Sequence, residues 1–424
     1  MERLLIKEIS NHENENVVIK GRIFNIRKLG NIVFLIIRDY TGVIQVVASK
    51  DIEANSGDIV SVEGLIKKDE RAKGGYEMKG NKIEIITKNI ETLPFDLEKD
   101  DINLNLNTLL DYRTISLRHP RVQAIFRLYD ILLKSYENVM RDEGFIEIKT
   151  PKILGSASEG GANFFKVDYF EKKAVLAQSP QFYKQIMVGV FENVFEIGSV
   201  FRAEPHYTTR HVNEYISLDA EMGYIDDFYD ITKKLNRIVK KIMEDIKREG
   251  GEYLKLYNIE IDDVLEEIPC IKLSEMRKII KEKYDYEIPK ETDIDPKGEE
   301  LAGKYAKEVI NSDFIFLTHY PFEYRPFYTM PDGEETCGFD LLYKGLEIAT
   351  GGQRINEYDD LINNMKKKGV PVEGMEFYVN SFKHAIPPHG GWGMGSERII
   401  KQLLNLDSIK EAVLFPRDVK RIIP

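Results

Sequence analysis

The sequence predicts an α+β protein with two folded units, a small N-terminal β-barrel followed by a larger antiparallel sheet flanked by helices. Five short β-rich runs separated by turn residues fill residues 17–90. A strongly alternating segment, residues 201–222, indicates two half-buried strands joined by a polar loop. Helical spacing of apolar residues governs residues 121–143 and most of residues 227–320. A chain of 424 residues is long enough for two or more domains.

Composition limits the function classes. The hydrophobic content of 42% is sufficient for packed cores. The net charge of −11 argues against a protein that coats nucleic acid nonspecifically. The charge is uneven, because residues 1–90 carry +2 and the remainder −13. The N-terminal unit is therefore the better place for a polyanion to bind.

Cysteine usage and the N-terminal sequence indicate the compartment. Cys270 and Cys337 lie far apart in no metal-ligand spacing, which predicts free thiols in a reducing environment. Charged residues such as Arg3 and Lys7 come too early for a signal peptide, and no apolar run approaches membrane-spanning length. We therefore expect a cytoplasmic protein.

The N-terminal runs suit an OB-fold barrel, which we place at residues 1–92, with a polar connector holding one short ordered turn at residues 93–118. OB-folds commonly bind single-stranded nucleic acid through a polar groove and aromatic stacking. Phe34, Arg27 and Gln45 are candidate contacts. From the pattern alone, a core position explains Phe34 better, as it does most aromatics in such a barrel.

The second domain is placed at residues 119–424. It opens with the helix predicted over residues 121–143, which Gly144 ends. The run FIEIKT then reads as a strand stopped by Pro151. Periodicity alone gives this helix and strand no role beyond core structure.

A glycine- and serine-rich stretch, GSASEGGANFF, predicts a mobile loop that holds Glu159. After a short buried strand, Ser179 and Pro180 read as the N-cap and first residue of a helix. Gln181 and Lys184 are three residues apart and share a face of that helix. A helical lysine usually has a solvated end, so the spacing alone is a weak signal.

The alternating hairpin concentrates charge on one face. Arg202 and Glu204 lie on this face before the turn, and Asp219 follows on the second strand. The loop adds Arg210 and His211. A solvated sheet face explains these charges as well as a binding site does, so the hairpin alone leaves both open.

The C-terminal third returns to β structure after helices that offer few candidate site residues. Glu347 lies near the end of a strand, just before Gly351-Gly352 and Arg354. Glycines there let a backbone approach a ligand closely. The run PPHGGWGMGSERIIKQLL leads into a helix with Arg398 in its first turn. It is no Walker loop, yet it can hold an anionic nucleotide; tight helix–sheet packing is the plainer explanation.

Together these segments resemble a known family. FRAE…R…EYISLDAEM is similar to motif 2 of class II aminoacyl-tRNA synthetases, and GWGMGSER to motif 3. The helix and strand ending at Pro151 resemble motif 1, which forms the family's dimer interface. With an OB-fold in front, this is the class IIb layout. SEGGANFF, LAQSPQFYKQ, GLEIATGGQR and PPHGGWGMGSER resemble the archaeal type of the aspartyl-tRNA synthetase family, over nearly the whole chain.

The resemblance implies a homodimer that uses ATP and Mg²⁺ to ligate L-aspartate to tRNA(Asp) through an aspartyl-adenylate. Arg202 is expected to grip the α-phosphate and the aspartate α-carboxylate, and Arg398 to clamp the γ-phosphate. Glu347 is expected to ligate Mg²⁺ with Thr350 assisting, because Mg²⁺ prefers oxygen ligands. The other implied ATP-binding residues are Glu204, Arg210, His211, Val212, Gly395, Ser396 and Glu397.

The resemblance also assigns amino-acid choice. Lys184 and Arg354 would hold the β-carboxylate of aspartate and reject the neutral amide of asparagine. Glu159 and Asp219 would accept the α-ammonium group, and a loop at residues 158–161 would close over aspartate. The implied aspartate-binding set is Glu159, Gln181, Lys184, Arg202, Asp219, Thr350 and Arg354.

In the barrel, the family likeness gives Phe34 a stacking role on the anticodon, with Gln45 reading the middle uridine and Arg27 close by. Some relatives charge only tRNA(Asp), whereas relaxed ones also charge tRNA(Asn). Discriminating enzymes tend to have tryptophan where Phe24 stands, and relaxed ones histidine. Phenylalanine is neither, and the missing tryptophan favours the relaxed form.

Two other interpretations stay open at this point. One is a related ligase, either an asparaginyl-tRNA synthetase or a tRNA-independent asparagine synthetase paralogue; Lys184 argues against the first and the OB-fold against the second. The other is a non-catalytic RNA-binding paralogue. The presence of Arg202, Glu347 and Arg398 argues against it.

Overall fold

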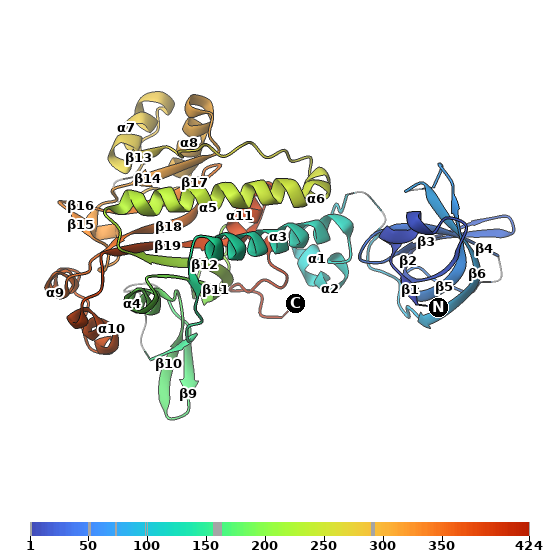
Figure 1. Cartoon of the computed structure of the whole chain (residues 1–424), viewed down its shortest axis with the longest axis horizontal. Helices are drawn as coiled ribbons and strands as arrows, with labels where there is room; N and C mark the ends of the chain where they lie inside the picture. The colour runs from blue at the N-terminus through green and yellow to red at the C-terminus, as the bar shows by residue number, and fades with distance from the viewer. Residues whose placement is uncertain are drawn as a thin grey trace. The chain divides into compact units, whose positions relative to one another are not determined.

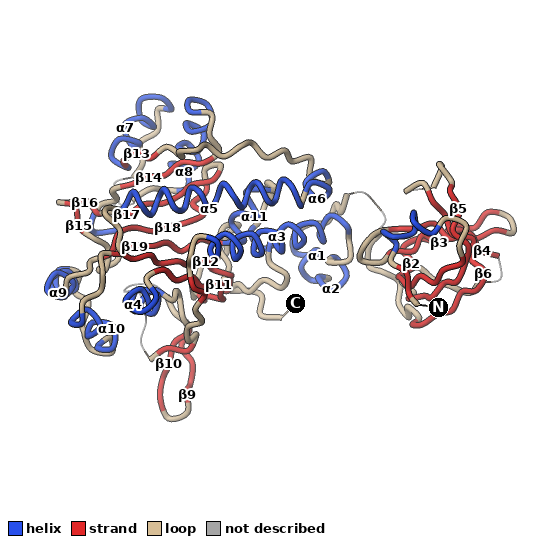
Figure 2. Tube along the Cα trace, viewed as in Figure 1, coloured by secondary structure: helices blue, strands red, loops and turns tan. Residues whose placement is uncertain are grey.

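The computed structural model describes residues 2–49, 52–72, 74–97, 99, 101–155, 163–289 and 293–423. The chain forms two compact units, Met1–His119 and Pro120–Pro424 (Figure 1). The predicted α+β class is confirmed, since an OB-fold barrel precedes a mixed unit of sheet and helices (Figure 2).

The N-terminal unit is a closed barrel built from the five predicted runs. Its strands follow the order β1-β2-β3-β4-β6-β5, and β2 also pairs with β5 to close the barrel. The elements are β1 (Arg3–Leu4), the 3-10 helix η1 (Ile6–His12), β2 (Asn16–Leu29), β3 (Ile32–Arg38), β4 (Val43–Ser49), β5 (Ile59–Lys68) and β6 (Tyr76–Thr87).

Alternation along β3 fixes what the barrel buries. Val33, Leu35 and Ile37 point inward and are at most 1% exposed. Phe34 lies between them on the outer face and is only half-buried. A one-residue shift would exchange the two faces, so the apolar set specifies the register.

The connector holds more order than the single turn predicted. Helix α1 (Leu106–Asp111) is capped by Asn105, whose side chain accepts a hydrogen bond from the Thr108 backbone N–H. Helix α2 (Arg113–Ser116) follows directly.

The second unit is built on an eight-stranded sheet in the order β13-β14-β17-β18-β19-β12-β11-β7. Neighbouring strands are antiparallel except at the two edges, where β13 pairs with β14 and β11 with β7 in parallel. Its strands are β7 (Ile146–Glu147), β11 (Asn193–Phe201), β12 (Glu214–Gly223), β13 (Cys270–Lys272), β14 (Phe314–Thr318), β17 (Gly338–Tyr343), β18 (Leu346–Arg354) and β19 (His389–Gly395). Smaller pieces are β8 (Ile153–Leu154), β9 (Lys166–Tyr169), β10 (Lys172–Leu176), β15 (Pro331–Asp332) and β16 (Glu335–Thr336).

Helices cover one face of this sheet, and α3 and α5 run side by side across it (Figure 1). Leu128, Leu132 and Leu235 from these helices pack with Phe195 and Trp392 of the sheet in the main core. The helices are α3 (Pro120–Asp142), α4 (Gln181–Phe191), α5 (Phe228–Glu249), α6 (Gly251–Lys255), α7 (Leu273–Tyr284), α8 (Pro296–Tyr305), α9 (Tyr358–Lys367), α10 (Glu376–Ser381) and α11 (Ser396–Leu403). Short 3-10 or π turns are η2 (Ala306–Ile310), η3 (Phe322–Tyr324), η4 (Phe382–His384) and η5 (Ile409–Ala412).

Two local predictions need correction. The strand predicted before Pro151 is only the two residues of β7, because Lys149 and Thr150 leave the ladder to bond β11 through the Ile197 carbonyl and the Glu196 side chain. Helix α4 begins at Gln181 with Pro180, not Ser179, at the N-cap position.

Candidate active site

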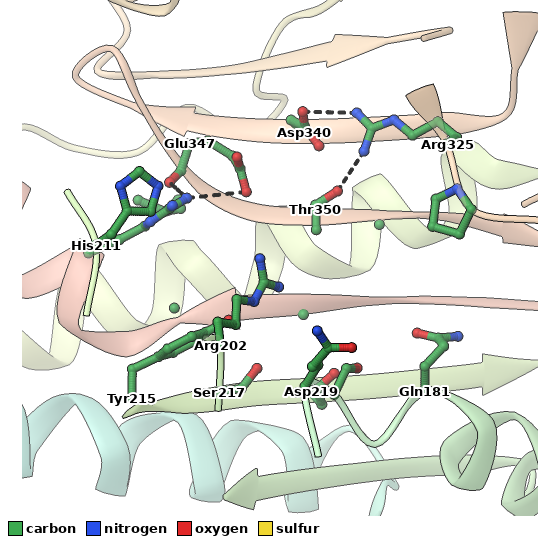
Figure 3. Close-up of a pocket in the computed structure, with 18 of the residues that line it drawn as sticks. Gln181, Arg202, His211, Tyr215, Ser217, Asp219, Arg325, Asp340, Glu347 and Thr350 are labelled. Atoms are coloured by element: carbon green, nitrogen blue, oxygen red, sulfur yellow. Dashed lines mark hydrogen bonds and ion pairs between the residues drawn. The ribbon is translucent and has the colours of Figure 1, made fainter. Parts of the chain in front are cut away.

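A pocket of about 370 Å³ opens on the sheet face that α3 and α5 leave free. Strand alternation creates it: Leu218 and Ala220 of β12 point into the core, whereas Ser217 and Asp219 line the pocket. Figure 3 shows Arg202, Ser217 and Asp219 on one side, facing Asp340, Arg325 and Thr350 on the other.

The hairpin of β11 and β12 forms one wall of this pocket. Arg202 directly follows β11, and its backbone N–H donates to the Asn213 carbonyl at 2.9 Å. The Asn213 side chain donates back to the Arg202 carbonyl at 2.6 Å. The Arg202 guanidinium lies 5.8 Å from the centre of the Tyr215 ring. These contacts fix the point at which the guanidinium enters the pocket.

Two buried cations lie at the other end of the pocket, both paired with carboxylates of β12. Lys184 Nζ lies 3.0 Å from Asp219 Oδ1 and 2.8 Å from the Trp392 carbonyl. Arg354 Nε lies 2.8 Å from Glu221 Oε1. Burial opposes ionisation of Glu221, yet Arg354 and Lys184 hold its pKa below the usual value. The four charges therefore compensate one another without solvent.

Opposite the hairpin, two carboxylates of neighbouring strands lie among arginines. Arg398 Nη1 donates to the Glu347 carbonyl at 2.9 Å and lies 3.3 Å from its Oε1. Arg325 donates to Thr350 Oγ1 at 2.7 Å and pairs with Asp340 at 2.9 Å. The enclosed position opposes ionisation of Glu347, but four arginines, Arg398 foremost, lower its pKa. Burial raises the pKa of Asp340 despite Arg325, and Glu347 adds to this rise.

The donor set around Glu347 fits a divalent cation that is shared with a substrate. Asp340 Oδ1 is buried and has no hydrogen-bond partner among the described residues. The described residues contain no cluster of three or more His, Cys, Asp or Glu side chains able to hold a metal by themselves. Mg²⁺ usually takes one or two carboxylates and completes its shell with phosphates and water, which matches this arrangement.

The loop between β11 and β12 brings Arg210 and His211 to the pocket. Arg210 forms an ion pair with Glu299 of α8. His211 Nδ1 is 2.7 Å from Thr208 Oγ1, and its Nε2 is 3.7 Å from Glu204. Burial lowers the pKa of His211 more than Glu204 raises it, and nearby arginines lower it further. The lowered pKa favours the neutral form of His211.

The glycines divide into two groups. A Cβ atom on Gly391 would lie 2.1 Å from the Ala220 carbonyl, and one on Gly351 would lie 2.5 Å from the Gly391 carbonyl. Here absent side chains let neighbouring strands close together. Gly393 and Gly395 have no such close neighbour and line the pocket. Tight strand packing thus explains Gly351 and Gly391, whereas access for a ligand explains Gly393 and Gly395.

Most of the residues predicted from sequence lie together at this pocket. They are Gln181, Lys184, Arg202, Glu204, Arg210, His211, Val212, Asp219, Glu347, Thr350, Arg354, Gly395, Glu397 and Arg398. Ser396 is buried beneath it and bonds Tyr129 and the Ile216 carbonyl. The Glu397 carboxylate also turns away, accepting from the Ile216 N–H at 3.0 Å. Glu159 lies outside the described residues.

Sequence reasoning missed several charged residues at the site: Glu221, Glu299, Arg325 and Asp340. Glu221 had a signal, since it continues the alternation that includes Asp219. Asp340 opposes Thr350 in the β17–β18 ladder, a register that no local pattern predicts. Glu299 and Arg325 reach the site from a helix and a loop without a distinctive motif.

In the barrel, three predicted contacts lie on neighbouring outer positions. Arg27 pairs with Phe34 across β2 and β3, and Gln45 pairs with Ile36 across β3 and β4. Phe24 instead lines a cavity of about 590 Å³ between the middle of β2 and the segment that follows β6, within the N-terminal unit.

A pocket of this kind on an antiparallel sheet, in a chain that also carries an OB-fold, defines a class II tRNA synthetase. Residues 105–419 match the family model of class II tRNA synthetases (D, K and N), and residues 17–86 match that of the OB-fold nucleic acid binding domain. None of the helices in the described ranges is long and apolar enough to span a membrane.

The relatives narrow the family further. The aspartate–tRNA(Asp/Asn) ligase of Deinococcus radiodurans is 41% identical, over 100% of this chain and 99% of the relative. The aspartate–tRNA(Asp) ligase of Pyrococcus abyssi is 39% identical, over 97% and 96%. The asparaginyl-tRNA synthetase of Pyrococcus horikoshii, solved with asparaginyl-adenylate, superposes with a TM-score of 0.92 at 28% identity over 100% of both chains. The chain belongs to the aspartate–tRNA ligase family of class II synthetases.

Proposed function

We propose that this chain ligates L-aspartate to tRNA(Asp) in two steps, through an aspartyl-adenylate. The observation that carries the proposal is the buried pair of cations, Lys184 and Arg354, at one end of the pocket. Arg202 lines the other end of the same pocket. A dicarboxylic amino acid can thus place one carboxylate against the cations at each end. An amino acid with a neutral amide side chain cannot form the second of these ion pairs.

In the first step, an oxygen of the aspartate α-carboxylate attacks the α-phosphorus of ATP in line, and the bond to pyrophosphate breaks. Arg202 would bridge the carboxylate and the α-phosphate and stabilise the charge that develops between them. Arg398 and Arg210 would hold the outer phosphates. In the second step, the terminal ribose 3′-hydroxyl of the tRNA attacks the adenylate carbonyl, and AMP leaves. Positioning and electrostatics carry most of the rate.

Glu347 would hold Mg²⁺ with ATP bound, and the orphaned Oδ1 of Asp340 makes that residue the second protein ligand in this proposal. Thr350, whose hydroxyl accepts a hydrogen bond from Arg325, would assist. Bound Mg²⁺ supplies neutralisation of the phosphate charge.

The barrel would bind the anticodon of the tRNA partner. The half-buried Phe34, flanked by Arg27, supports stacking on an anticodon base of tRNA(Asp). The proposal includes charging of tRNA(Asn) as well. It is supported by phenylalanine instead of tryptophan at position 24 and by relatives named for both tRNAs. We further propose a cytoplasmic homodimer that pairs through the α3 and β7 region.

Aspartate-dependent exchange between ATP and labelled pyrophosphate tests the first step without tRNA. The wild-type chain should exchange with aspartate and not with asparagine, and Arg202→Ala should abolish the exchange. Arg237→Ala, at an exposed position on α5, is the matched control and should retain it. Near-normal exchange by Arg202→Ala, or preference for asparagine, would contradict the proposal.

A further inference from the structure

Glu299 lies in a region without any predicted site residue, yet it contacts two residues of the ATP site. Its Oε2 accepts a hydrogen bond from the Glu347 backbone N–H at 3.2 Å. The same oxygen pairs with the Arg210 guanidinium. Its side chain is 10% exposed, so these contacts are largely shielded from water.

Helix α8 gives Glu299 a fixed position. Asp295 caps the helix by accepting from the Gly298 N–H at 3.0 Å. Leu301 and Ala302 pack in a separate buried cluster with residues of β14 and β17. A Cβ atom on Gly303 would lie 2.3 Å from the Gly345 nitrogen, so the helix abuts the turn before β18. Glu299 is therefore anchored to the strand that carries Glu347.

Arg210, in contrast, belongs to the irregular loop between β11 and β12. Holding a long arginine side chain in one conformation costs conformational entropy, which a charge-assisted hydrogen bond to a fixed carboxylate offsets before a ligand arrives. On the other side, Arg398 contacts both the carbonyl and the carboxylate of Glu347. Arg210, Glu299, Glu347 and Arg398 thus form one continuous chain of contacts between two phosphate-binding candidates.

We propose that Glu299 is a positioning residue for the triphosphate end of ATP, which sets Arg210 and the Glu347 backbone before the nucleotide binds. This inference rests on the proposed adenylation reaction. Glu299 touches neither aspartate nor the reacting atoms. Its loss should weaken the use of ATP and leave the use of aspartate unchanged.

The test compares Glu299→Gln with Glu300→Gln in pyrophosphate exchange. The glutamine at 299 keeps an acceptor for the Glu347 N–H and cannot carry the negative charge that holds Arg210. Burial raises the pKa of Glu299 to about 7, so exchange is measured at about pH 8, where the carboxylate is ionised. Glu300 is the adjacent, exposed residue of the same helix, so its variant makes the same chemical change without these contacts. Glu299→Gln should raise the KM for ATP about tenfold, because a charge-assisted contact is lost. The KM for aspartate should stay within about twofold.

A double variant separates positioning from a general structural role. In an Arg210→Ala background, Glu299→Gln should raise the KM for ATP no further, since its partner is already absent. Full additivity of the two changes, an unchanged or lower KM for ATP in Glu299→Gln, or equal effects at 299 and 300 would each overturn the inference. If the wild-type chain shows no aspartate-dependent exchange, it is the proposed function that fails.

Discussion

The two units handle charge in opposite ways. In the second unit, the charged residues at the amino-acid end of the pocket are almost fully buried: Lys184 and Asp219 are 2% exposed, Glu221 0% and Arg354 5%. Each has a partner of opposite sign within this group. In the barrel, Arg27 is exposed, while Phe34 and Gln45 are half-buried on outer strand positions.

The difference shows what each task demands of the fold. A buried charge is tolerated only when a partner compensates it, so the pocket's cations are part of the structure as well as of the site. An RNA-reading surface keeps its contacts in water until the RNA arrives, and the apolar core beneath it does not depend on them. Substitutions in the pocket should therefore lower the free energy of unfolding. Substitutions on the outer face of the barrel should weaken only tRNA binding.

The largest expected effect is on Arg354. Arg354→Met leaves the fully buried Glu221 with Lys184, at 3.4 Å, as its remaining ion-pair partner in the described part of the chain. Breaking a buried pair from one side costs about 3–5 kcal/mol of folding free energy. Urea unfolding followed by the fluorescence of Trp392, the sole tryptophan and buried in this unit, measures the loss. Arg27→Met, the same change on the barrel, should leave the circular dichroism transition unshifted. Equal unfolding midpoints for both variants would contradict this difference between the two units.

The next effect concerns the orphaned carboxylate oxygen of Asp340. Asp340→Asn should slow pyrophosphate exchange about 100-fold at fixed Mg²⁺, because a weaker ligand holds the cation that would neutralise the phosphate charge. Added Mg²⁺ should restore part of the rate. Stability should fall as well, because the neutral amide removes the carboxylate that pairs with the largely buried Arg325 at 2.9 Å. Asp332→Asn, on an exposed turn nearby, serves as the control and should need no extra Mg²⁺. If Asp340→Asn needs no more Mg²⁺ for exchange than the wild-type chain, Asp340 is not a ligand of the proposed metal site.

Local patterns were sufficient wherever one face of an element is buried. β-rich runs between turn residues located all five barrel strands, and the period of two located the hairpin and put Arg202 and Asp219 on the pocket side. The period of 3.6 located α3 within a residue at each end. These signals are local because each residue's side is decided by its own strand or helix.

Contacts between distant segments were not predictable in this way. Arg325 meets Asp340 and Thr350 only because a loop folds over β17 and β18. Glu299 reaches Arg210 across 89 residues of sequence, from a helix whose pattern reads as ordinary packing. Pairing within the pocket, such as Lys184 with Asp219, depends on how α4 docks on β12, which no single-segment pattern contains.

A smaller effect, confined to RNA binding, is expected for Phe34. Phe34→Ala should raise the KM for tRNA(Asp) about tenfold, since stacking of a base on an aromatic ring is worth about 1–3 kcal/mol. Pyrophosphate exchange and the unfolding midpoint should not change, because Phe34 is not part of the barrel core. Ile86→Ala, at an exposed barrel position, is the control and should leave the KM for tRNA unchanged. Loss of exchange in Phe34→Ala would show that the two units are not separable by function.

The smallest effect should come from Phe24, which changes only the choice between two tRNAs. Its ring lies 5.6 Å from the Arg38 guanidinium and lines the cavity beside the middle of β2. Phe24→Trp adds an aromatic ring to that cavity, whose volume of about 590 Å³ can take it without disturbing the core. The family resemblance associates tryptophan here with discrimination, so the ratio of kcat/KM for tRNA(Asn) to that for tRNA(Asp) should fall about tenfold, equivalent to about 1.4 kcal/mol.

Charging both purified tRNAs with labelled aspartate, with wild-type and Phe24→Leu chains alongside, measures the ratio. A wild-type chain that leaves tRNA(Asn) uncharged would refute the relaxed specificity. If Phe24→Trp leaves this ratio unchanged, the contact that discriminates between the two tRNAs lies elsewhere on the barrel.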